Sequence, residues 1–98
     1  MQISKQLSYS GGFKEAADEV AKLEAAGLDL VWVAEAYGFD GPSLMGYLAA
    51  KTSTVQIASG ILPVHTRTPT LLAMTAAGVD SLSDGRCQLG LGASGPQV

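Results

Sequence analysis

Hydrophobic side chains follow a helical spacing in three parts of the chain. Between residues 13 and 26 they recur every three or four positions, as on one face of an α-helix, and Gly27 follows as a helix stop. Residues 42–51 and 69–82 each begin with proline, with a capping residue, Asp40 or Thr68, one or two positions before it, which is typical of a helix start. The pattern therefore predicts three helices.

Four other runs are apolar or alternate in polarity, as β-strands do. The second of them, LDLVWVA, is almost continuously apolar from Leu30, which is typical of a strand buried on both faces. The strands are predicted over residues 2–8, 28–34, 55–58 and 87–91.

Predicted strands and helices alternate as βαβαβαβ. This order implies parallel strands joined by right-handed crossovers and places the chain in the α/β class. Two architectures are compatible with it, an open doubly wound sheet and part of a (β/α)8 barrel. A complete barrel needs about 250 residues, so 98 residues would supply half of one. We expect strands adjacent in chain order, with helices on one side in a barrel segment and on both sides in a doubly wound sheet.

Composition narrows the class of protein. The chain is 47% hydrophobic and 15% charged, with a net charge of −3, so we expect a globular domain that binds neither nucleic acid nor an anionic membrane. No apolar run approaches the roughly 20 residues of a membrane span. The first ten residues lack the core of a signal peptide, so a cytoplasmic location is expected. Cys87, the single cysteine, is interpreted as a small buried residue rather than a reactive thiol.

The third predicted strand leads into the run SGILPVHTRTPT, residues 59–70. Ligands of α/β proteins dock at the carboxyl ends of strands. Gly60 would let a ligand approach the main chain closely, and Ile61 and Leu62 would offer apolar contact beside it. This combination would suit a flat, partly apolar cofactor. An ordinary connection between strand and helix, with glycine at a bend, explains the same residues.

Other candidate residues are less specific. Glu35, at the end of the second strand, could orient a polar ring edge or act as a base, and a surface carboxylate is the alternative. His65 favours a surface or hydrogen-bonding role, and Arg67 suits either a phosphate or a neighbouring carboxylate. The run GLGASG, residues 90–95, follows a strand and could offer backbone N–H groups to a ligand, although the dinucleotide pattern it matches is weak alone.

Three runs taken together resemble one known family. They are residues 28–38, 59–69 and 82–92. With these runs the chain resembles the N-terminal part of a luciferase-like monooxygenase. Within that family it is most similar to the coenzyme F420-dependent oxidoreductases. The resemblance implies that residues 1–98 form the N-terminal half of a TIM-type (β/α)8 barrel, with a deazaflavin or a flavin at the carboxyl ends of the strands.

The resemblance also implies roles for individual positions. The family has a non-proline cis peptide at the end of the third strand, which corresponds to Gly60-Ile61. Glu35 is the catalytic candidate, although related members often carry an aspartate-histidine pair where this chain has Ala34-Glu35. The residues implied to bind the cofactor are Ser59, Gly60, Ile61, Gly92, Ala93, Ser94 and Gly95.

The expected function is that of an oxidoreductase that transfers a hydride between coenzyme F420 and a small organic substrate. An FMN-dependent monooxygenase is the alternative within the same superfamily. A non-catalytic α/β fragment that folds only with a partner or a second copy is the alternative from another class. No metal site is expected, and a homo-oligomer stays open. The 98 residues alone are not expected to turn over substrate.

Overall fold

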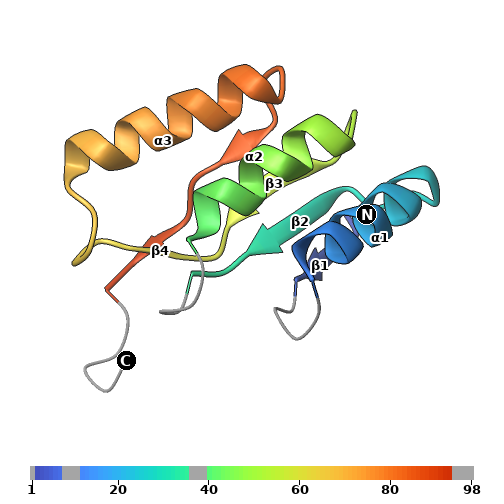
Figure 1. Cartoon of the computed structure of the whole chain (residues 1–98), viewed down its shortest axis with the longest axis horizontal. Coiled ribbons are helices and arrows are strands. Elements are labelled where there is room, and N and C mark those ends of the chain that lie inside the picture. The colour runs from blue at the N-terminus through green and yellow to red at the C-terminus, as the bar shows by residue number, and fades with distance from the viewer. Residues whose placement is uncertain (1, 8–11, 36–39, 94–98) are drawn as a thin grey trace.

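A computed structural model describes residues 2–7, 12–35 and 40–93, and Figure 1 shows a twisted sheet with helices along one side. The elements are β1 (Ser4–Gln6), α1 (Phe13–Ala25), β2 (Leu30–Val33), α2 (Gly41–Lys51), β3 (Gln56–Ser59), β4 (Leu62–Pro63), α3 (Pro69–Leu82), β5 (Cys87–Gln88) and β6 (Leu91–Gly92). All three predicted helices are present, and each boundary lies within one residue of its predicted position.

Helix starts follow the capping chemistry of the sequence. The carboxylate of Asp40 accepts a hydrogen bond from the Ser43 N–H, and the hydroxyl of Thr68 accepts one from the Leu71 N–H. Proline stands in the first turn of both α2 and α3, where its missing N–H leaves no helical bond unmade. Gly27 has a φ of 109°, a conformation that favours glycine after a helix.

The main sheet has the order β1-β2-β3-β5, and all three neighbouring pairs are parallel. Helix α2 packs between α1 and α3, so the helices form a single layer over one face of the sheet (Figure 1). Sequential parallel strands with right-handed crossovers place every helix on the same face. This confirms the barrel-type arrangement and excludes a doubly wound sheet for the described elements.

The strand predicted over residues 87–91 is interrupted, whereas β3 matches the strand predicted over residues 55–58 to within one residue. The third strand continues after residues 60–61 as β4, and the predicted strand 87–91 is divided into β5 and β6, with Leu89 and Gly90 between them. Strands β4 and β6 pair in parallel as a second, short sheet. The breaks in the two neighbouring strands lie beside each other, which keeps the pairing on both sides of them.

The hydrophobic core lies between the sheet and the helices. Val31, Val33 and Ile57 are fully buried there, together with Leu48 of α2 and Val20 of α1. On β2, Trp32 alternates with Val31 and Val33 and lies outside this core cluster, partly exposed. The parity of Trp32 thus assigns it to the face of the sheet without helices.

The amino ends of the strands are closed by two charged side chains. Arg86 is only 8% exposed, and its guanidinium donates to the carbonyl oxygens of Ala49, Thr52, Val55 and Ser83. The carboxylate of Glu24 accepts hydrogen bonds from three successive backbone N–H groups, residues 53–55. Both side chains fix the connection between α2 and β3 and leave the opposite end of the sheet for other roles.

Cys87 is half-buried and packs against the core, and burial raises the pKa of its thiol. These observations agree with the interpretation of Cys87 as a small packing residue rather than a reactive thiol. In the part of the chain that the structure describes, no helix has the length and apolar character needed to cross a membrane.

Candidate functional site

The carboxyl ends of β2, β3 and β5 meet at a ledge that we call the shelf, defined as Ser59, Gly60, Ile61, Gly92 and Ala93. The Gly60-Ile61 peptide is cis, as expected from the family resemblance. The Gly60 N–H donates to the Val33 carbonyl at 2.8 Å, and the Ile61 carbonyl accepts from the Glu35 N–H at 3.3 Å. The shelf is thus attached to the end of β2 by main-chain hydrogen bonds on both sides of the bend.

Ser59 joins the two interrupted strands. Its hydroxyl donates to the Gly90 carbonyl at 2.8 Å and accepts from the Gly90 N–H at 2.7 Å, so one side chain replaces the missing ladder bonds between β3 and β5. The same carbonyl accepts from the Leu62 N–H at 3.0 Å. Ser59 is fully buried, so its hydroxyl fixes the shelf from below and only its backbone belongs to the ledge.

Three glycines are sterically required around the bend. A Cβ on Gly60 would lie 2.8 Å from the indole of Trp32, and one on Gly90 would lie 2.3 Å from the Ser59 carbonyl oxygen. A Cβ on Gly92 would overlap the Ile61 side chain, at 2.2 Å from Cδ1. Glycine at position 90 therefore lets two backbones approach one another, and glycine at positions 60 and 92 leaves room for the side chains of Trp32 and Ile61. Gly60 and Gly92 are partly exposed at the ledge.

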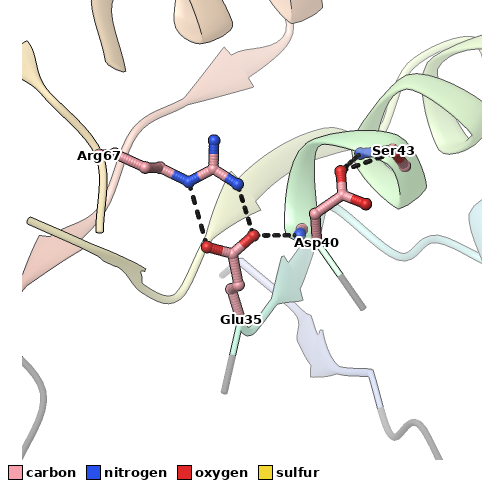
Figure 2. A network of polar contacts seen from close by, with 5 residues as sticks. Glu35, Asp40, Ser43 and Arg67 are labelled. Atoms are coloured by element: carbon pink, nitrogen blue, oxygen red, sulfur yellow. Dashed lines mark hydrogen bonds and ion pairs between the residues drawn. The ribbon is translucent and has the colours of Figure 1, made fainter. Parts of the chain in front are cut away.

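Glu35 forms a two-point ion pair beside the shelf (Figure 2). Its oxygens accept from Arg67 Nε at 3.1 Å and from Arg67 Nη2 at 2.6 Å, and Oε2 also accepts from the Gly41 N–H at 2.6 Å. The two charged side chains are 11% and 13% exposed. The pair connects the end of β2, the first turn of α2 and the loop that follows β4.

The protonation state of Glu35 follows from these contacts. Partial burial alone would raise the pKa of this carboxyl, but the hydrogen bonds from Arg67 and Gly41 and the guanidinium charge hold the pKa below its usual range. Glu35 is therefore an anion at neutral pH, and three donors already occupy its oxygens. This geometry favours a positioning role, and action as a base stays a prediction.

We expect the Glu35→Gln substitution to lower the free energy of unfolding by about 2 kcal/mol at pH 7, because it removes a charge-assisted pair that is mostly buried. A carboxyl whose folded-state pKa is depressed stabilises the fold above its unfolded pKa, about 4.3, and that stability is lost as pH falls through the folded value. Thermal unfolding of the wild type and of the Glu35→Gln variant from pH 7 to pH 3 should therefore show midpoints that differ at pH 7 and converge at low pH. A constant difference would contradict the ionic origin.

The structure brings most of the predicted site residues together. Glu35, Gly60, Ile61 and Gly92 lie at one end of the sheet, and Ala93 follows β6 and is exposed. Ser94 and Gly95 lie outside the described residues. The role of these residues in cofactor binding stays a prediction. The side chains of residues 2–7, 12–35 and 40–93 form no cluster of three or more histidine, cysteine or acidic groups suited to a metal ion.

Sequence reasoning missed some contributors to this end of the sheet. Trp32 supports Gly60 from below, a role that its parity opposite Val31 and Val33 could have indicated. A neighbouring carboxylate was one of the two partners that the sequence predicted for Arg67, and the structure shows that it is Glu35, a partner without a local signal in the sequence. His65 is exposed in the loop after β4, as its preferred interpretation requires.

A cavity of about 360 Å³ lies beside the first turns of α3. Arg67 contributes one wall, and the other walls are apolar. The complete lining is Val64, Arg67, Pro69, Leu72, Ala73, Leu89 and Leu91. The cavity opens at the β5–β6 edge, where a further βα unit of a barrel would pack.

A parallel βα sheet with one layer of helices over one face is the arrangement found in a segment of a (β/α)8 barrel. The family model for luciferase-like monooxygenases matches residues 1–98, and the chain belongs to that family. A Mycobacterium tuberculosis protein, provisionally named a coenzyme F420-dependent oxidoreductase, is 41% identical over the whole chain. A luciferase-like monooxygenase of Escherichia coli is 31% identical over 92% of it. The chain spans 29% of each relative's length.

Solved structures agree on the fold. The coenzyme F420-dependent tetrahydromethanopterin reductase of Methanopyrus kandleri superposes on 98% of this chain with a TM-score of 0.91 and 23% identity, over 28% of its own length. The oxygenating constituent of 3,6-diketocamphane monooxygenase of Pseudomonas putida, solved with FMN, covers 99% with a TM-score of 0.79 and 19% identity, over 31% of its own length. The fold of this chain is thus shared by an F420-dependent reductase and by a monooxygenase solved with FMN.

Proposed function

We propose that this chain is the cofactor-facing part of a luciferase-like oxidoreductase that transfers a hydride between coenzyme F420 and a small organic substrate. One observation carries the proposal: a ledge of glycine backbone and one isoleucine at the carboxyl end of β3, in a chain that belongs to the family over its whole length. The relative named for F420 is the most similar of those described above, at 41% identity. A cytoplasmic location goes with this proposal.

The residues present are suited to a flat heterocycle. Gly60, Ile61 and Gly92 are partly exposed and Ala93 is exposed, so the ledge offers main-chain polar groups beside an aliphatic side chain. The Ser59 hydroxyl is fully engaged with Gly90 and contributes nothing directly to a ligand. A bound deazaflavin would supply the hydride chemistry, and the chain would supply position and shelter from water.

The ion pair of Glu35 and Arg67 has a supporting role in this proposal. It joins the loop after β4 to the first turn of α2, so the segments on both sides of the ledge are held in one arrangement. Ligand positioning within fractions of an ångström depends on such support. We therefore assign Glu35 to positioning the ledge.

Two alternatives differ in cofactor or in class. An FMN-dependent monooxygenase is supported by the FMN complex of the Pseudomonas putida neighbour, whose fold this segment shares. A non-catalytic fragment that folds only with a partner is supported by the exposed apolar residues Leu89 and Leu91 at the β5–β6 edge. Preference for FMN over F420 would distinguish the first alternative from the proposed function. Stable folding without a partner would argue against the second alternative.

A chimera tests the proposal. Residues 1–98 would replace the matching 100-residue segment of the Mycobacterium tuberculosis relative, and binding of F420 and FMN would be followed by fluorescence. We expect F420 to bind at least 10-fold more tightly than FMN. The Gly92→Leu substitution should weaken F420 binding at least 10-fold, because a side chain at this position displaces Ile61.

The matched control is Ala25→Leu on α1, where an added side chain is exposed and far in sequence from the ledge. It should leave F420 binding unchanged. Preferential FMN binding by the chimera would favour the monooxygenase alternative. A folded chimera that binds neither cofactor, while the unmodified relative binds F420, would overturn the proposal.

A further inference from the structure

The face of the main sheet without helices carries one aromatic side chain, that of Trp32, among the residues of β1, β2, β3 and β5. In the register of the sheet Trp32 stands between Gln6 on β1 and Ala58 on β3, and Gln88 follows on β5. This face becomes the interior when a barrel closes, and barrel interiors are filled mostly by valine, isoleucine and leucine. A tryptophan among two amides and an alanine departs from that pattern, directly below the shelf.

The indole of Trp32 lies against the underside of the shelf. A Cβ on Gly60 would be 2.8 Å from Cε3, 3.5 Å from Cδ2 and 3.6 Å from Cβ of Trp32. These atoms extend from the root of the side chain to its six-membered ring, so Gly60 faces the indole along its length. Ala58, two residues before Gly60, is fully buried and lies outside the core cluster on the helix side. The small residues at positions 58 and 60 leave the room that the indole occupies.

A main-chain bond holds Gly60 from a second direction. Its N–H donates to the carbonyl of Val33, the residue after Trp32, at 2.8 Å. This bond fixes the distance between Gly60 and β2 within the sheet, and the indole limits how far Gly60 can move toward the interior. Two successive residues of β2 therefore determine where the ledge stands.

We infer that Trp32 is the positioning residue of the shelf, holding Gly60 at the level at which a cofactor ring lies on Gly60 and Ile61. The inference rests on the proposed function, because it concerns the same ledge. Trp32 acts through Gly60 and does not itself have to touch the ligand. A ledge matches a rigid planar ring only when its atoms are placed within a fraction of an ångström, and an indole with two rotatable angles is a stiff support.

The contact itself is tested without any cofactor, in the 98-residue chain. Gly60→Ala should lower the midpoint of thermal unfolding, because the added methyl group overlaps the indole. The φ of Gly60 is not positive, so alanine meets no backbone penalty of that kind. In a Trp32→Ala background the same substitution should cost nothing, because the methyl group enters vacated space. Additive effects of the two substitutions would show that the residues are not coupled and would overturn the inference.

The chimera tests what this contact does for the ligand. Trp32→Ala should weaken F420 binding about 10-fold or more, and Trp32→Phe, which keeps a smaller ring, should weaken it less. Free indole at millimolar concentration should restore binding to the Trp32→Ala chimera, because it can occupy the vacated space. Gly60→Ala should weaken binding about 10-fold in the unmodified chimera and less than about 2-fold in the Trp32→Ala background. Circular dichroism reports folding, and Trp32→Phe carries the comparison if Trp32→Ala unfolds.

Tyr47→Ala is the matched control, because it removes an aromatic side chain that packs against the core on the helix side. It should lower the midpoint of thermal unfolding and leave the F420 dissociation constant unchanged, with or without indole. A Trp32→Ala chimera that loses stability but binds F420 as tightly as the unmodified chimera would overturn the inference and leave the proposed function standing. A chimera that binds neither F420 nor FMN would overturn the proposed function, and with it the inference. Should the chimera bind FMN instead, the same comparisons with FMN decide the role of Trp32.

Discussion

Residues 1–98 alone are expected to show no turnover and no micromolar binding of F420 or FMN. Four parallel strands cannot close a barrel, and within the described residues β1 and β5 form the two open edges of the main sheet. The phosphate site of such barrels is frequently built by loops after the seventh and eighth strands. The shelf alone would contact only the ring system, so a highly charged cofactor would lose much of its anchoring.

Fluorescence titration with oxidised and reduced F420 and with FMN measures this directly, and sedimentation in the same samples reports the assembly state. We expect dissociation constants above about 100 µM, whereas the chimera should bind F420 at least 10-fold more tightly than the isolated segment. Self-association through the apolar edge residues Leu89 and Leu91 should appear at high concentration. Micromolar binding by a stable monomer would show that half of a barrel suffices.

The elements of this fold were accessible from the sequence because their signals are local. Asp40-Gly41-Pro42 and Thr68-Pro69 contain both a cap and a first-turn proline, and the two helices begin there in the structure. The alternation of strands and helices fixed the parallel order. One-sided helices were one of two predicted outcomes, and topology alone did not decide between them.

The details of the site depend on contacts between distant parts of the chain. The break in β5–β6 at Gly90 exists because Ser59, 31 residues away, binds both polar groups of its backbone. Nothing local to residues 87–91 indicates that break. The partner of Arg67 lies 32 residues away, at Glu35, and both residue types suit several roles. Sequence therefore indicated which positions gather at the carboxyl ends, and packing decided what each side chain does there.

Sequence reasoning did not identify Arg86, which follows the tight turn after α3. The sequence places it beside a strand, where a charged residue usually faces water. The structure instead buries it, with Nε and both terminal nitrogens bound to carbonyl oxygens and to the Thr52 hydroxyl. Its charge lies at the carboxyl end of α2, where the last carbonyls of the helix favour a cation.

The Arg86→Met substitution is expected to lower the free energy of unfolding by at least about 3 kcal/mol, a large share of the 5–15 kcal/mol typical of a domain. Methionine fills similar space, but four buried carbonyl groups, those of residues 49, 52, 55 and 83, lose their donor. The carbonyl groups of Ala49 and Thr52 lie at the carboxyl end of α2, where the helix itself offers no N–H group to replace the guanidinium. The loss should therefore exceed that of an ordinary core substitution of equal volume.

Urea unfolding followed by circular dichroism measures this effect, and a loss of this size should lower the midpoint by about 2 M with an unchanged slope. Arg86→Lys should fall between wild type and Arg86→Met, because lysine keeps the charge but has three donors on one nitrogen instead of five on a planar fork. Lys22→Met, on the exposed face of α1, is the matched control and should change stability by less than about 0.5 kcal/mol. A loss below 1 kcal/mol for Arg86→Met would mean that water reaches these carbonyls once the guanidinium is gone, and that the connection between α2 and β3 holds without it.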